Sequence, residues 1–425
     1  MSFQQGLSGL NSSSKNLSVI GNNIANANTF GSKTARAEFS DVYAAAVGNT
    51  SSNVGIGTNL STVAQQFTQG NITTTDNSMD LAISGGGFFQ ITDGINPTLY
   101  TRNGQFKVDR EGFIVNNSKL RLMGYPADAA GVIQPGAAVG LQLPNAGVVP
   151  KPTDTISVRM NLDSRLKATG LAAAPGINFQ DATTYNNATS MTAFDVRGQE
   201  VAMTLYFQKT DTPGATPDEI IWNVFATANG TTVGGDPPQP IATLTYPANG
   251  GAQLAPLAPV VVTQIVAGPN AQGAVIVPLD NVAFDLTKTT QFGSPFGVTE
   301  LTQNGYAAGQ MTGIAFNSDG TVMARYSNGR SQPVGRVELA NFRNPQGLQA
   351  IGDNAWRSTV ASNDAVRGVP GDGNMGALQA SALEESNIDL TGELVGMITA
   401  QRIYQANAQT IKAQDQILQT LVNLR

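Results

Sequence analysis

A chain of 425 residues with 41% apolar residues can bury the cores of two or three domains, and its 46 glycines and 21 prolines favour turn-rich β structure. Charged residues make up 13% of the chain and the net charge is −6, so the sequence does not favour nucleic-acid binding. Cysteine and histidine do not occur, which excludes thiol catalysis, disulfides, the usual zinc sites and histidine acid–base chemistry.

Carboxylates could still carry acid–base chemistry, but Asp109, Asp319 and Asp372 lie in glycine-containing turns, where aspartate typically makes local hydrogen bonds. We expect no enzymatic activity, no cofactor and no metal site. We also expect no membrane insertion, because the most apolar window, residues 254–267, is interrupted by Pro256 and Pro259. The N-terminus lacks the continuous apolar core of a secretory signal peptide. Any export is therefore expected to proceed without a cleaved signal.

The first predicted element is an amphipathic helix over residues 2–27. Its large apolar residues recur at intervals of three, four or seven, which is the spacing of a stripe near a heptad period. These residues are Phe3, Leu7, Leu10, Leu17, Ile20 and Ile24. Gly6, Gly9 and Gly21 each disfavour the helix by roughly 1 kcal/mol relative to alanine, so it is expected to be marginal alone.

The middle of the chain is predicted to fold as two β domains, one inserted into the other. Residues 31–70 form a polar, extended connecting segment, and residues 71–147 with 291–360 form a discontinuous first β domain. Residues 148–290 form the inserted outer β domain, where alternation of apolar and polar residues indicates a half-buried strand. The alternating apolar residues are Val201, Met203, Leu205 and Phe207.

A second connecting segment, residues 361–379, precedes the C-terminal helix. It contains a formal GxGxxG motif at residues 371–376, which we interpret as a linker because Pro370 precedes it and no βαβ unit surrounds it. Ser386 and Asp389 fit a capping box at the start of the helix. Its apolar stripe consists of Leu390, Leu394, Met397, Ile398, Tyr404, Ile411, Leu418 and Leu421.

The two ends, residues 1–30 and 380–425, are predicted to form one helical assembly domain. Ordering about 65 terminal residues costs on the order of 65–130 kcal/mol of backbone entropy. Burial of the two stripes against each other and against neighbouring subunits can offset this cost, so we expect coiled-coil-like pairing on assembly. Spacing alone leaves open that the stripes are ordinary core.

Three stretches of the chain resemble the rod and hook proteins of the bacterial flagellum. The first has NNIANANT at residues 22–29 and GSK at 31–33; the second has DLAI at 80–83, GFF at 87–89 and YTRNGQF at 100–106. The third begins with LEESNIDL at residues 383–390 and continues to the C-terminus. Rod proteins are generally shorter and lack a large inserted domain, so the length favours the hook branch.

This resemblance implies a subunit that polymerises into a flexible tubular universal joint between rod and filament, with a central export channel. The implied partners are further copies of the chain, the rod, hook-cap and hook–filament junction proteins, and the flagellar type III export apparatus. The implied location is the extracellular hook. The position of the family's export-recognition element is occupied by Phe39, Val42 and Tyr43.

Two other interpretations stay open from the sequence. The chain could be a distal rod subunit, which would form straight, stiff polymers. It could instead be a secreted adhesive or glycan-acting β protein, which would have rigid ends in the monomer and a ligand pocket.

Overall fold

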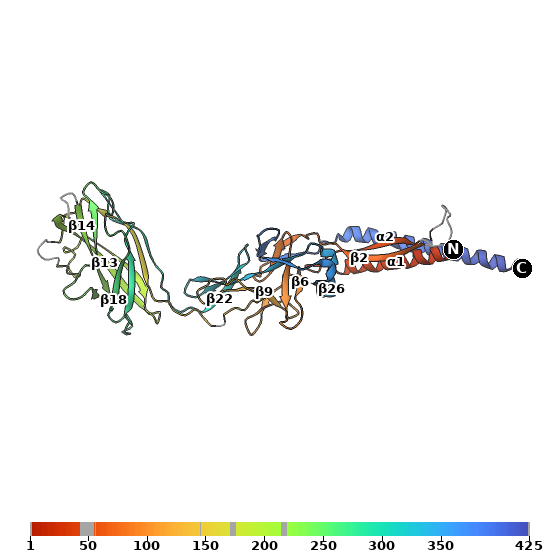
Figure 1. Cartoon of the computed structure of the whole chain (residues 1–425), viewed down its shortest axis with the longest axis horizontal. Helices are drawn as coiled ribbons and strands as arrows, with labels where there is room; N and C mark the ends of the chain where they lie inside the picture. The colour runs from red at the N-terminus through yellow and green to blue at the C-terminus, as the bar shows by residue number, and fades with distance from the viewer. Residues whose placement is uncertain are drawn as a thin grey trace. The chain divides into compact units, whose positions relative to one another are not determined.

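The computed structural model describes residues 2–42, 55, 57–144, 146–170, 176–213 and 219–423. The chain forms two compact units. The first unit comprises Met1–Asn145, Thr312–Arg325 and Ser331–Arg425, and the second comprises Ala146–Met311 and Tyr326–Arg330. Figure 1 shows the elements of each unit along the chain.

The first unit contains two long helices and a β-hairpin that contacts one of them. The helices are α1 (Ser2–Ala25) and α2 (Leu390–Asn423), and the hairpin strands are β1 (Ala35–Val42) and β2 (Gly57–Gln65). The helices lie side by side and run antiparallel, and the hairpin packs against α1 (Figure 1). The predicted extended segment 31–70 thus contains an antiparallel hairpin.

Both predicted helix boundaries differ from the structure. The first helix ends at Ala25, and a turn follows where the sequence pattern extended the helix to residue 27. The second begins at Leu390, four residues later than predicted. Residues before it form a strand and bond to other segments, and Asp389 is the N-cap, because its Oδ1 accepts a hydrogen bond from the Thr391 amide at 3.0 Å.

The β part of the first unit is built around one large sheet with the strand order β22-β23-β24-β9-β5-β6-β27-β26. Strands β7, β8, β10, β25 and β28 join this sheet, while β29 pairs with β4 and β3 pairs with β30. Segments on both sides of the second unit in sequence contribute strands, as in the discontinuous arrangement expected above.

The strands of this part are β3 (Ile72–Thr74), β4 (Leu81–Ser84), β5 (Phe88–Thr92), β6 (Leu99–Thr101), β7 (Lys107–Val108), β8 (Ile114–Val115), β9 (Arg121–Pro126), β10 (Val139–Gly140), β22 (Met311–Phe316), β23 (Thr321–Tyr326), β24 (Ser331–Val337), β25 (Leu339–Asn341), β26 (Gln349–Gly352), β27 (Ala355–Arg357), β28 (Val366–Gly368), β29 (Ala377–Ala380) and β30 (Ala382–Glu384). Short 3₁₀ helices occupy Pro345–Gly347 and Val360–Ser362.

The second unit is a β-sandwich. One sheet has the order β17-β20-β11-β19-β18 with β21 on β11, and the other has the order β12-β13-β14-β15 with β16 on β14. The strands are β11 (Thr155–Asp163), β12 (Asn187–Phe194), β13 (Glu200–Pro213), β14 (Glu219–Ala228), β15 (Thr231–Val233), β16 (Ala242–Pro247), β17 (Gly251–Ala252), β18 (Val260–Ile265), β19 (Leu279–Asp285), β20 (Thr290–Phe292) and β21 (Gly297–Gln303).

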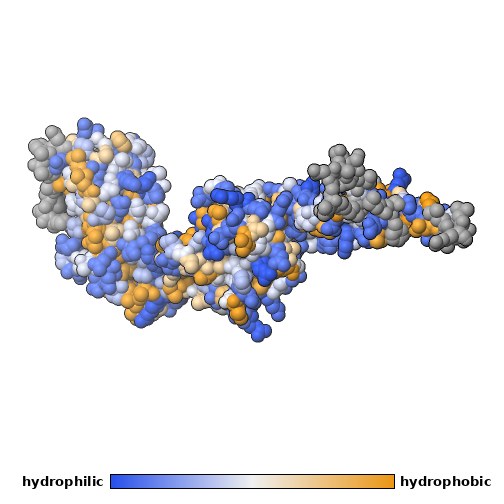
Figure 2. Space-filling model, turned by 45° about the vertical axis from the view of Figure 1, so that its right-hand side comes forward, coloured by the Kyte–Doolittle hydropathy of each residue, from blue (hydrophilic) through white to orange (hydrophobic). Residues whose placement is uncertain are grey.

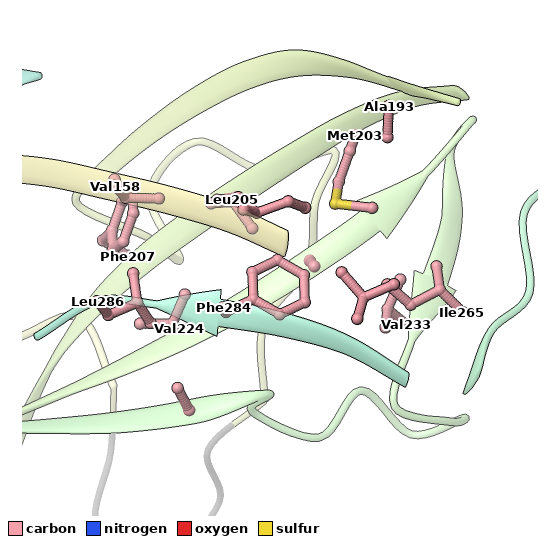
Figure 3. Close-up of a cluster of buried hydrophobic side chains, with 14 of the residues drawn as sticks. Val158, Ala193, Met203, Leu205, Phe207, Val224, Val233, Ile265, Phe284 and Leu286 are labelled. Atoms are coloured by element: carbon pink, nitrogen blue, oxygen red, sulfur yellow. The ribbon is translucent and has the colours of Figure 1, made fainter. Parts of the chain in front are cut away.

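Side chains from both sheets form one apolar core in the second unit (Figure 3). Met203, Leu205 and Phe207 of β13 lie in this core, so the alternation read from the sequence is confirmed for that strand. Val158 and Phe284 enter from the facing sheet. The shared core means that neither sheet is shielded from water without the other.

The second unit extends further along the chain than the predicted range 148–290. Strand β21 follows that range and pairs antiparallel with β11, as in the partnership of Leu301 with Val158. The unit therefore continues to Met311. Sequence alternation alone did not show this, because it identifies a strand but not the distant strand with which it pairs.

The GxGxxG motif at residues 371–376 forms a turn between β28 and β29, as the linker interpretation expects. The amide of Met375 donates to the carbonyl of Asp372 at 2.9 Å, which closes the turn.

Candidate assembly interface

Small residues of α1 allow the two helices to approach closely. A Cβ atom added to Gly9 would lie 2.9 Å from Nδ2 of Asn407, and one added to Gly6 would lie 3.0 Å from Cγ1 of Ile411. On the opposite helix, Gly396 lies near Ile20. The first two glycines therefore disfavour the isolated helix but permit the helix pair, whereas an added Cβ on Gly21 would meet open space.

A buried asparagine joins three elements of the helical part. Asn23, which is 2% exposed, donates from Nδ2 to Glu393 Oε1 of α2 at 2.9 Å and to the Ala35 carbonyl of β1 at 2.8 Å. Its Oδ1 accepts from the Ala35 amide at 3.0 Å. This side chain sets the position of α1 relative to both α2 and the hairpin.

The apolar stripe of α1 is partly covered within the chain. Ile20 is buried, Leu10, Leu17 and Ile24 are half-buried, and Leu7 is 44% exposed. Phe3 lies in α1, but its side chain is outside the described residues. The apolar stripe predicted for α1 is therefore covered only in part within the single chain.

The apolar residues of α2 do not form one stripe facing α1. Met397 and Ile411 are half-buried, whereas Leu394 and Ile398 are 46% and 52% exposed. We call the exposed set the outward apolar residues of α2: Leu390, Leu394, Val395, Ile398, Ile403, Tyr404, Ile417 and Leu418. Leu421 lies in α2, but its side chain is outside the described residues.

At 3.6 residues per turn, the outward apolar residues of α2 point to several sides of the helix. Leu394 and Ile398 share one side, whereas Val395 and Ile403 lie on others. The C-terminal end of α2 extends beyond the start of α1 (Figure 1). Orange apolar patches lie among blue polar ones on the helical part in Figure 2. Exposed apolar residues outside a single stripe are typical of a helix that is covered by more than one neighbour.

The predicted export-recognition residues lie on the hairpin. Phe39 and Val42 belong to β1 and are 39% and 38% exposed, while Tyr43 lies outside the described residues. The hairpin is held to α1 by polar contacts, including the Ser12–Thr58 hydroxyl pair at 2.8 Å. Both described side chains are therefore partly accessible on a segment that is anchored to the helix.

A buried cluster of charges lies where the helical part meets the β part of the first unit. Glu384 accepts from Lys33 Nζ at 2.6 Å through Oε1 and from Arg102 Nη1 at 2.9 Å through Oε2. The side chains of Lys33 and Glu384 are fully buried, and that of Arg102 is 5% exposed. We call these three residues the buried triad.

The environment of the buried triad acts on both cations. Burial lowers the pKa of Lys33, and the charge of Glu384 opposes this effect. Burial likewise lowers the pKa of Arg102, again opposed by Glu384. The carboxylate is thus the only anion of the triad that offsets two desolvated cations.

The triad was not predicted from the sequence, although each of its members lies in a stretch that carries the family resemblance. Lys33 ends the GSK motif, Arg102 lies in YTRNGQF and Glu384 lies in LEESNIDL. The presence of one of these charged residues in each of the three motifs was the available signal. Their convergence was not visible, because 282 residues separate Arg102 from Glu384.

None of the helices in the described ranges is both long enough and apolar enough to cross a membrane. The same ranges contain no group of three or more acidic side chains arranged to hold a metal ion.

The fold defines a mainly β protein whose paired terminal helices keep apolar side chains exposed and whose β units have their own cores. Comparisons with known proteins identify the family. Four family profiles match successive parts of the chain: flagella basal body rod protein (residues 3–33), flagellar hook protein FlgE/F/G D1 domain (82–161), flagellar basal body protein FlaE D2 domain (161–306) and flagellar basal body rod FlgEFG protein C-terminal (379–424).

Curated relatives match over the full length. The flagellar hook protein FlgE of Escherichia coli K12 is 40% identical over 434 residues, covering 100% of both chains. Those of Salmonella typhimurium LT2 and Rhizobium meliloti 1021 are 39% and 33% identical, covering 100% of this chain and 100% and 98% of their own. The chain belongs to the flagellar hook protein family.

A solved structure has a similar fold. The crystal structure of Helicobacter pylori flagellar hook protein FlgE2 matches with a TM-score of 0.53 at 13% sequence identity. The match covers 73% of this chain and 100% of that one. The mainly β fold with helical termini predicted from the sequence is confirmed.

Proposed function

We propose that this chain is the repeating, non-enzymatic subunit of an extracellular flagellar hook, polymerising into a flexible tube that joins rod to filament around a central export channel. Its further partners are the rod, hook-cap and hook–filament junction proteins. The observation that carries the proposal is the set of outward apolar residues of α2, which the single chain leaves exposed on several sides. Family membership supports it independently.

Contacts between copies are expected to cover Leu394 and Ile398. Burial of a large apolar side chain contributes about 1.5–3 kcal/mol, so removing both should weaken each contact between two copies by about 3–6 kcal/mol. A variant with Leu394→Ser and Ile398→Ser should therefore fail to form polymers that sediment or appear in electron micrographs. Its two β units should keep their circular dichroism spectrum, because neither side chain belongs to their cores.

The matched control carries Gln401→Ser and Gln405→Ser, two exposed polar positions of the same helix. This variant should polymerise like the unaltered chain. Normal polymerisation of the Leu394/Ile398 variant would refute a role for the outward apolar residues in assembly.

A distal rod subunit is the second candidate, since two of the matching profiles are described as rod proteins. The full-length matches to hook proteins favour the hook. Polymer shape separates the two, because a hook predicts curved, bendable polymers in electron micrographs and a rod predicts straight ones.

We also propose that Phe39, Val42 and Tyr43 are recognised by the flagellar type III export apparatus, without cleavage of a signal. Partial exposure of the first two supports this assignment. Phe39→Ala should lower the amount of chain secreted by a flagellated cell several-fold while its intracellular level is kept. Leu60→Ala, a half-buried position paired with Phe39 in the hairpin, is the control and should be secreted normally.

A further inference from the structure

Glu384 bonds to four residues that lie in three separate segments of the sequence. Besides Lys33 and Arg102, its Oε1 accepts from the Gly70 amide at 2.9 Å, and its backbone carbonyl accepts from the Gly31 amide at 2.8 Å. Gly31 and Lys33 belong to the first limb of the N-terminal connecting segment, residues 31–34, and Gly70 belongs to its second limb, residues 66–70. Arg102 belongs to the β part. All hydrogen-bonding atoms of one side chain are thus shared among separate segments.

Asn387 repeats this pattern three residues later. Its Oδ1 accepts from the Thr34 amide at 2.8 Å, and its Nδ2 donates to the Gln66 carbonyl at 2.8 Å and to Thr68 Oγ1 at 2.7 Å. Strand β30 also pairs with β3, which begins at Ile72, two residues after Gly70. The C-terminal connecting residues therefore lie between both limbs of the N-terminal segment.

The N-terminal limb fits closely against the β part of the first unit. We call the place where both limbs and the C-terminal connecting residues meet the β part the junction. Gly31 has a φ of +70°, and a Cβ there would lie 2.5 Å from the backbone nitrogen of Asn103 in the β part. Lys33 Nζ also donates to the Thr68 carbonyl at 2.7 Å, which joins the two limbs to each other. A side chain at Gly31 would therefore prevent the N-terminal limb from reaching the β part.

The charges make each docked segment depend on the other. Without the C-terminal segment, Lys33 and Arg102 would be buried cations with no carboxylate. Without the N-terminal segment, Glu384 would lose the contacts to Lys33 and Gly70, and Asn387 would lose its contacts to Thr34, Gln66 and Thr68. Leaving one member of a buried ion group uncompensated is strongly unfavourable.

We propose that residues 31–34, residues 66–70 and residues 381–387 dock onto the β part of the first unit as one cooperative step, coupled through Glu384. The two terminal helices leave from this junction, α1 before residue 31 and α2 after residue 389. Joint docking therefore places the two helices side by side in one event. The coupling is a property of the chain and does not require that it polymerises.

The competing possibility is that each segment docks alone. Phe67 packs edge to face against Phe88 and Trp356, with ring centroids 5.5 Å and 5.4 Å apart, and this contact involves no C-terminal residue. On the other side, the Ala382 amide bonds to the Asp80 carbonyl without any N-terminal residue. Each segment thus has a contact to the β part that does not involve the other segment. Joint and independent docking are distinguished by substituting a residue in one segment and measuring amide exchange in the other.

Hydrogen exchange of the full-length chain, free and polymerised, provides this test. The Gln66 amide bonds to the Thr34 carbonyl within the N-terminal segment, so it reports on that segment alone. Glu384→Gln should speed its exchange roughly 5- to 150-fold, the range of typical coupling energies. Lys33→Met should speed exchange of the Ala382 amide by a similar factor, because coupling between two sites is reciprocal.

Two neighbouring substitutions serve as controls. Glu385→Gln changes an adjacent, half-buried carboxylate, and Arg36→Met removes a nearby cation that is exposed to solvent and pairs with Glu38. Neither should alter the two reporter amides. The Leu81 amide, bonded to Gly104 within the β part, should keep its exchange rate in every variant and so show that this part stays folded.

Accelerated exchange of both reporters in their respective variants supports the proposal. Faster exchange that is confined to the substituted segment would overturn it. It would also be overturned if both reporter amides of the unaltered chain exchanged without protection, in the free and in the polymerised state. Polymerisation of each variant, scored separately, tests the proposed function and leaves this comparison independent.

Discussion

At the scale of single residues, buried polar side chains determine how the segments of the first unit are arranged. Asn23 and Glu384 each bond to groups from at least two distant segments. Hydrogen bonds are directional, so these residues specify an orientation that apolar contact alone does not. The cost of removing them is concentrated in the partners that are left buried without a bond.

Asn23→Ala should lower the free energy of unfolding of the first unit by about 2–4 kcal/mol, because three hydrogen bonds are lost and the Ala35 backbone groups lose their partner. Urea denaturation measures this change. The neighbouring Asn22→Ala is the control, since Asn22 is exposed, and it should change stability by less than about 0.5 kcal/mol. Equal effects of the two substitutions would contradict the role assigned to Asn23.

At the scale of elements, the helix pair is defined by where a side chain is absent. Gly9 lies against the Asn407 side chain of α2, and Gly6 lies against that of Ile411. Gly396 of α2 likewise lies near Ile20, so each glycine makes room for a larger side chain of the other helix. The outward apolar residues of α2 stay exposed in the single chain. One side of α2 is therefore an intrachain contact, and we expect neighbouring copies to cover the others.

Gly9→Leu and Gly21→Leu form a matched pair, because both replace glycine with a good helix former in the same helix. At Gly9 the new side chain meets Asn407 and should separate the helices, which speeds amide exchange in α1 at least tenfold. At Gly21 it meets open space, and exchange should slow or stay unchanged. Slower exchange in both variants would show that helix propensity outweighs packing here.

At the scale of the whole molecule, the two units have separate cores. The core of the second unit uses residues of β11 through β21, and the aromatic cluster of the first uses Phe88, Tyr100, Phe342 and Trp356 with Leu348 and Ala340. No residue belongs to both clusters. Because each unit buries its own apolar surface, the two are expected to unfold in separate transitions.

Phe284→Ala should lower the stability of the second unit by about 3–5 kcal/mol, since the ring is fully buried between the sheets (Figure 3). Differential scanning calorimetry should show one transition moving to lower temperature and the other unchanged. Val261→Ala, an exposed position on the neighbouring strand β18, should move neither. A joint shift of both transitions after Phe284→Ala would mean that the units unfold together.

Periodicity was informative wherever a pattern repeats locally. It predicted both terminal helices and the buried positions of β13, and the family motifs predicted the hook assignment. It erred at the start of α2, where Ser386 looked like a cap but β30 and the bonds of Asn387 keep the preceding residues extended. It also ended the second unit too early, before β21.

By itself the sequence excluded cysteine and histidine chemistry and determined the β character of the middle, the helical ends and the family. Composition shows which side chains are present, and local period and short motifs depend only on residues that are close together in the chain. Only the tertiary structure decided that Gly6 and Gly9 form the helix contact, that α2 turns apolar residues to several sides, and that Lys33, Arg102 and Glu384 meet. These features depend on which distant segments become neighbours in space, and a local sequence pattern does not specify those contacts.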